Sequence, residues 1–205
     1  MRPLRTLRVA TLLLVLLSSA ACGEDTGTAS DIRSETTTDA KLEPITARGV
    51  AAVVRDALGA ERISAYSGSG EDDLVGATVR LGQGRDVVIV MVQTEGEAPV
   101  VDCDDLAATA TGAHSCTVAE DGTILAAGTG EAFSDSNSRG STVRAQSVNP
   151  ETGRVVLAVY ETYASRPALD AETLAEIVSD PDLAAMTDPS TNEAGADITM
   201  ERAGG

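Results

Sequence analysis

Aromatic and imidazole side chains are scarce in this chain of 205 residues. Aromatic residues make up 2% of it, tryptophan is absent, and His114 is the only histidine. A catalytic or metal site that needs two histidines is therefore excluded within one chain. Basic residues are also few, since 32 acidic residues face 15 basic ones and the formal net charge is -17. Without a basic surface and stacking aromatics, we exclude nucleic-acid binding.

The N-terminal residues have the three-part layout of a secretory signal peptide. Three arginines lie within the first eight residues, residues 9–17 form a short apolar run, and residues 18–21 are small. This order is typical of a signal that is removed on export. A transmembrane helix needs about 20 apolar residues, so the run is too short for a permanent span. We expect residues 1–21 to be cleaved.

The end of this segment, Ser19-Ala20-Ala21-Cys22, resembles the lipobox of bacterial lipoproteins. The resemblance implies that Cys22 carries a diacylglycerol and holds the protein at the extracytoplasmic face of the cell membrane. Ser19 departs from the family, which usually has Leu, Val or Ile there. The alternative is ordinary signal cleavage, which would leave Cys22 as a free thiol. The preference for arginine, with Lys41 as the single lysine, is similar to actinobacterial proteins.

Composition divides the rest of the chain into three parts. Residues 23–41 are rich in Gly, Ser, Thr and acidic residues and have almost no large apolar side chains. Such a segment cannot bury enough surface to offset its ordering entropy. We therefore expect a lipid-anchored flexible tether over residues 22–42, a single domain over residues 43–187 and a disordered tail over residues 188–205.

Hydrophobic periodicity within the domain predicts an α+β fold. Apolar residues recur at helical spacing over residues 46–58 and 170–179. Between these helices the sequence predicts strands over 62–66, 74–81 and 86–93, and two hairpins, 114–119 with 123–127 and 141–148 with 154–160. The run 86–93 is apolar at almost every position, which favours a central strand. We expect a mainly antiparallel sheet built from successive hairpins, with an N-terminal and a C-terminal helix covering one face.

Cys103 and Cys116 are the two cysteines that remain if Cys22 is lipidated. An even number of cysteines in an exported protein predicts a disulfide between them. The alternative is a metal site formed by Cys103, His114 and Cys116. It lacks a fourth ligand and the paired spacing of structural zinc sites, so we expect no metal and no cofactor.

No group of residues forms a recognisable catalytic set. Acidic clusters such as Asp102, Asp104 and Asp105 provide paired carboxylates, which glycosidases use for acid–base hydrolysis. On so acidic a surface these carboxylates are expected to be simply solvated. The polar loop over residues 129–141 contains Phe133 and Arg139, which we take as candidate binding residues. No catalytic residue is assigned.

These observations favour an exported, membrane-anchored lipoprotein that is not an enzyme. Its domain is expected to bind an unknown envelope protein or a small ligand at the outer face of the cytoplasmic membrane. One alternative is a hydrolase that uses carboxylates on cell-envelope material. Another is a structural envelope component without a discrete site.

The anchor predicts how the protein fractionates. Replacing Cys22 by Ala removes the thiol that would be acylated, so the Cys22→Ala protein should move from the membrane to the soluble fraction. Immunoblotting of fractionated cells measures this. Continued retention in the membrane fraction would contradict lipid anchoring.

Overall fold

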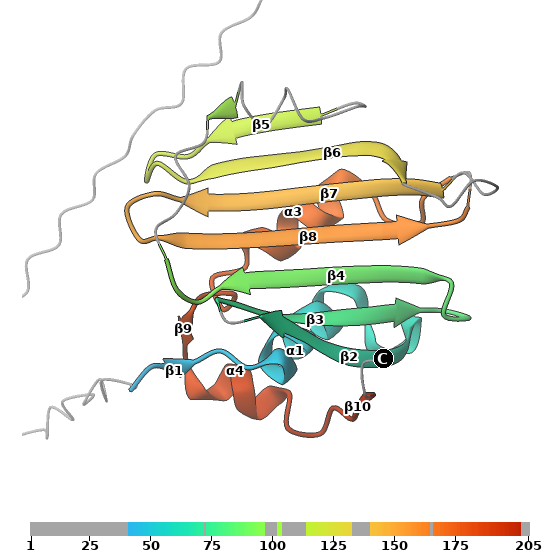
Figure 1. Cartoon of the computed structure of the whole chain (residues 1–205), viewed down its shortest axis with the longest axis horizontal. Coiled ribbons are helices and arrows are strands. Elements are labelled where there is room, and N and C mark those ends of the chain that lie inside the picture. The colour runs from blue at the N-terminus through green and yellow to red at the C-terminus, as the bar shows by residue number, and fades with distance from the viewer. Residues whose placement is uncertain are drawn as a thin grey trace, which may run out of the picture. The chain divides into compact units, whose positions relative to one another are not determined.

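The computed structural model describes residues 41–71, 73–96, 102–103, 114–132, 140–164 and 166–201. Figure 1 shows how the elements are arranged. In chain order they are β1 (Glu43–Pro44), α1 (Ala47–Leu58), the 3-10 helix η1 (Ala60–Arg62), β2 (Ile63–Glu71), β3 (Leu74–Leu81), β4 (Asp86–Gln93), β5 (His114–Val118), β6 (Ile124–Ala132), β7 (Gly140–Asn149), β8 (Arg154–Thr162), α3 (Ala171–Ser179), β9 (Met186–Thr187), α4 (Pro189–Ala194) and β10 (Met200–Glu201).

Eight strands form one sheet in the order β10-β2-β3-β4-β8-β7-β6-β5. All neighbours are antiparallel except β10 and β2, which are parallel. Strands β2 to β4 form one meander and β5 to β8 another, and the β4–β8 pair joins them. The prediction of an α+β fold with a mainly antiparallel sheet is confirmed.

Helices α1 and α3 pack against the same face of this sheet, which we call the helix-covered face (Figure 1). Alternate residues of the strands point toward them, as the period of two in a strand requires. The buried core combines both helices with five strands. Its strand members include Ala77, Val79, Val88, Val90, Val92, Ala127, Val143, Ala145, Val156, Ala158 and Tyr160, and its helix members include Val50, Val54, Leu58, Leu174, Ile177 and Val178. No helix in the described part of the chain is both long and apolar enough to cross a membrane.

Side-chain caps fix where the two main helices begin. The Thr46 hydroxyl accepts from the Gly49 N–H at 3.1 Å, and Asp170 Oδ1 accepts from the Thr173 N–H at 2.9 Å. Both bonds satisfy an amide that has no partner within its helix. The bonds from Thr173 lower the pKa of the Asp170 carboxyl, because they favour its charged form. The sequence predicted both helices from their apolar spacing, and the Thr46 cap was not predicted.

Several predicted boundaries are wrong. Strand β2 continues to Glu71, where the sequence predicted its end at residue 66. Strand β6 extends to Ala132, so part of the predicted loop over 129–141 is strand. Glycines and small residues gave these segments no apolar alternation, and pairing with β3 and β7 extends them instead.

The predicted disordered tail is wrong for residues 189–201, which contain α4 and β10. Asn192 on α4 accepts from the Thr46 N–H at 2.9 Å and donates to the Pro44 carbonyl at 3.0 Å. A Cβ at Gly195 would collide with the Arg48 carbonyl oxygen, so glycine is needed for the close packing of α4 on α1. The C-terminal segment is therefore part of the domain.

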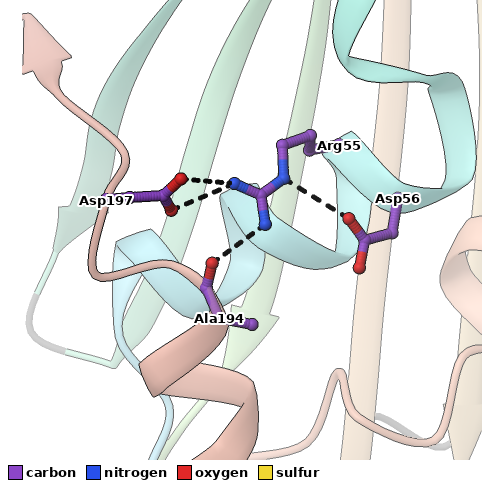
Figure 2. A network of polar contacts seen from close by, with 4 residues as sticks. All are labelled: Arg55, Asp56, Ala194 and Asp197. Carbon is purple, nitrogen blue, oxygen red and sulfur yellow. Dashed lines mark hydrogen bonds and ion pairs between the residues drawn. The ribbon is translucent and has the colours of Figure 1, made fainter.

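Arg55 on α1 ties the same segment to the domain (Figure 2). Its guanidinium donates to the Ala194 carbonyl at 2.9 Å and forms an ion pair with Asp197 at 3.1 Å. The hydrogen bond from Arg55 to Asp197 is the largest cause that raises the pKa of Arg55, which stays charged. Asp56 accepts from the same side chain at 3.3 Å.

Arg154, the first residue of β8, holds the end of α3 on the sheet. Its guanidinium donates to the carbonyl oxygens of Val178, Asp180 and Leu183 at 2.9, 2.6 and 2.8 Å, and to Ser147 Oγ at 3.1 Å. A positive charge at the C-terminal end of a helix also interacts favourably with the helix dipole. Burial lowers the pKa of Arg154, and the charge of Asp180 opposes that effect.

Replacing Arg154 by Met should lower the free energy of unfolding by about 3 kcal/mol, because three carbonyls lose a charged donor in a partly buried site. Denaturant unfolding measures the change. The matched control is Arg166→Met, which removes an exposed arginine and should change stability by less than about 0.5 kcal/mol. Equal effects of the two substitutions would contradict the role of Arg154.

Candidate binding surface

Strands β4 and β8 carry apolar side chains on both faces of the sheet. On the helix-covered face, Val88, Val90 and Val92 of β4 are fully buried. On the opposite face, which we call the open face, the side chains of β4 and β8 are half-buried. Six of them form what we call the apolar strip: Val87, Ile89, Met91, Val155, Leu157 and Val159.

The apolar strip does not belong to the main core. None of its six residues is in the buried core cluster or among the partly buried residues that pack against that cluster. Helices α1 and α3 both lie behind the sheet in Figure 1, with the open face toward the viewer. No described helix packs on the open face over the strip, although Val148 of β7, which pairs with Val155 on that face, is fully buried. The strip is thus a contiguous apolar surface that is half-buried and not exposed outright, and contiguous apolar surface that solvent reaches can mark an interaction site.

Charged residues flank the apolar strip. Arg80 on β3 pairs with Val87, and Arg144 on β7 pairs with Val159, so both side chains lie on the open face. Both are exposed, and neither forms an ion pair with any described residue. Glu161, on β8, also pairs with Val87. The surroundings of the strip are thus more positive than the chain as a whole, whose net charge is -17.

Cys103 and Cys116 form a disulfide, as predicted, with their Cα atoms 5.6 Å apart. Cys116 pairs with Ala126, which pairs with Gln146, which pairs with Leu157. This register places Cys116 on the open face, in the same row as the strip. The bonded sulfurs are not free to bind a metal ion, so the alternative metal site is wrong. No group of three metal-binding residues occurs in the described ranges of the chain.

Three predicted site residues lie outside the described residues. These are Cys22, the proposed lipidation site, and Phe133 and Arg139, the candidate binding residues.

The other residues singled out from the sequence are only partly described. Asp104 and Asp105 also lie outside the described residues, and Asp102 is exposed beside Cys103. His114 is exposed at the start of β5, opposite Gly128. The apolar strip was not predicted from the sequence, although the apolar run of β4 was its signal. Such a run shows that both faces are apolar, but not which face the helices leave uncovered.

Comparison with known proteins yields no family: no family model matches the chain, and no curated protein matches it.

The two faces of β8 should differ sharply in their tolerance of charge. Leu157→Lys places an ammonium on the open face, where it reaches water, and should lower the free energy of unfolding by about 1 kcal/mol. Val156→Lys places the ammonium on the helix-covered face, where Val156 is 0% exposed. This substitution should lower the free energy of unfolding by more than about 4 kcal/mol or prevent folding. Circular dichroism and denaturant unfolding compare the two neighbours. Equal losses would contradict an open face.

Proposed function

We propose that this protein is an exported, lipid-anchored binding module that acts without catalysis of its own. Its domain binds a protein partner through the apolar strip at the outer face of the cytoplasmic membrane. The observation that carries the proposal is a sheet with apolar side chains on both faces and helices on one. The signal-like N-terminal residues, Cys22 and the polar segment after it support this proposed location.

The charges beside the apolar strip indicate the chemistry of the partner. Arg80 and Arg144 lie at opposite sides of the strip, on β3 and β7. A surface with an apolar centre and acidic groups at its edges complements this arrangement. We infer a protein partner rather than a membrane lipid, because a chain with a net charge of -17 is repelled by anionic headgroups.

Hydrolysis is less well supported than binding. The acid of a carboxylate hydrolase needs an environment that keeps it protonated, usually a dry one. Asp102, the only member of its cluster among the described residues, is exposed. The geometry therefore favours a binding surface over a carboxylate active site.

Site-specific photocrosslinking in intact cells tests the proposal. A photoreactive amino acid at Leu157 on the open face should give one discrete protein adduct. The same group at Glu172, exposed on α3, should not give it. The double reversal Arg80→Glu with Arg144→Glu should abolish the adduct, because it would repel an acidic partner.

The control reversal, Arg48→Glu with Arg166→Glu, changes the same net charge at exposed positions off the strip and should leave the adduct intact. Three results would contradict the proposal. They are lipid adducts alone, identical adducts from positions 157 and 172, or an adduct that both double reversals weaken equally.

A further inference from the structure

A cleft of about 390 Å³ lies at the turn between β3 and β4. It is lined by Arg62, Leu81, Gly82, Gln83, Arg85, Asp86 and Ala168. Its volume is at the lower end of the range of about 300–1,000 Å³ that is typical of small-molecule sites. These residues come from three places in the sequence: the end of η1, the β3–β4 turn, and the segment before α3.

Backbone contacts hold the walls of the cleft in place. The Gly82 N–H donates to the Arg62 carbonyl at 2.9 Å, and the Gly84 N–H donates to the Leu81 carbonyl at 2.9 Å. Gly82 and Gly84 have φ values of 54° and 80°, in the left-handed region that favours glycine. The turn therefore keeps Arg62 and Arg85 at the same cleft.

The two arginines of the cleft have no structural task that the described residues reveal. Arg55 and Arg154 use their guanidinium groups to hold carbonyls and carboxylates of the fold. Arg62 and Arg85 are exposed and make no ion pair or side-chain hydrogen bond with the described part of the chain. A guanidinium binds a carboxylate with two parallel hydrogen bonds, so this pair provides an anion-binding wall.

Asp86 supplies the opposite charge, and its carboxylate is already oriented. Its Oδ2 accepts from the Tyr160 hydroxyl at 2.9 Å, and its Oδ1 accepts from the Thr162 hydroxyl at 2.7 Å. The Ala168 N–H donates to the Tyr160 oxygen at 3.3 Å. Burial is the main cause that raises the pKa of Tyr160, so the hydroxyl stays protonated and donates. Hydrogen bonding to Asp86 raises the same pKa further.

Each carboxylate oxygen has two lone pairs, so both Asp86 oxygens keep acceptor capacity after these two bonds. The carboxylate forms no ion pair with Arg62, Arg85 or any other described residue. The cleft thus combines the fixed Asp86 carboxylate with two arginines that have no described partner. A ligand that binds both needs an anionic group for the arginines and a cationic donor for Asp86.

We propose that this cleft binds a small zwitterion, whose carboxylate is held by Arg62 and Arg85 and whose ammonium group donates to Asp86. The site is independent of the protein-binding function proposed for the apolar strip. The cleft lies at the β3–β4 turn, whereas the strip begins at Val87, next to Asp86 in the sequence, and runs along β4 and β8 on the open face.

Amide-resolved NMR titration of the full chain tests the site with three probes: L-alanyl-L-alanine, acetate and ethylamine. The dipeptide should give saturable shifts at the amides of Gly82, Gly84 and Ala168. Acetate lacks the ammonium and ethylamine lacks the carboxylate, so each should bind at least about tenfold more weakly.

Arg62→Ala combined with Arg85→Ala should weaken dipeptide binding at least about tenfold. The matched control, Lys41→Ala with Arg48→Ala, removes the same charge at exposed positions outside the cleft and the strip and should leave binding unchanged. Because Asp86 also anchors Tyr160, the arginine pair is the primary test, and both arginines are exposed at a turn where their loss leaves the core intact.

Two results would overturn the zwitterion site: no saturable shift at the turn with the dipeptide, or equal weakening by both double variants. Dipeptide and acetate binding with the same affinity would also overturn it, because Asp86 would then have no part in recognition. The open-face crosslink does not depend on Arg62 or Arg85, so failure of this site is distinguishable from failure of the proposed function.

Discussion

The structure depends on an imbalance between a sheet that is apolar on two faces and helices that cover one. Strand β4 runs through the middle of the sheet between β3 and β8, and both of its faces are apolar. Burial against α1 and α3 stabilises the helix-covered face at roughly 25 cal/mol per Å² of apolar surface. The apolar strip gains no such cover from any described helix. A binding partner that buries it would gain this hydrophobic free energy.

Polar contacts hold both ends of the helical layer on its face. Arg154 fixes the C-terminal end of α3 through three carbonyl oxygens. Asn192 fixes α4 to the start of α1, and Arg55 binds the segment that follows α4. All of these contacts lie on the helix side of the molecule. The described polar contacts that hold the helices therefore make no use of the apolar strip.

The sequence predicted the features of the fold that depend on local sequence patterns. The two helices predicted from their apolar spacing and the hairpin turn between residues 119 and 123 form as expected, with Gly122 at a φ of 78°. The pairing of Cys103 with Cys116 followed from counting cysteines. The helices and the turn depend on residues that are close in the sequence, and the disulfide depends on a choice among few possible cysteine pairings.

What the sequence could not predict depends on contacts between distant residues. Asn192 lies 146 residues from Thr46, so a polar, small-residue segment gave no sign of the helix that docks there. The β3–β4 turn was expected, but its cleft needs Arg62 and Ala168 beside it, and only the fold brings these together. The open face could not be predicted from the sequence for the same reason. Strand periodicity gives the polarity of each face, whereas the position of the helices decides which face stays uncovered.

The most direct test of the open face as a binding surface is methionine oxidation followed by mass spectrometry, on purified protein and on intact cells. Met91 belongs to the apolar strip, and Met186, 47% exposed on β9, is an internal control. The account predicts that Met91 is oxidised in the purified protein and protected on cells, while Met186 is oxidised in both. Met91 that reacts equally on cells and in isolation, or that is unreactive even in the purified protein, would contradict it.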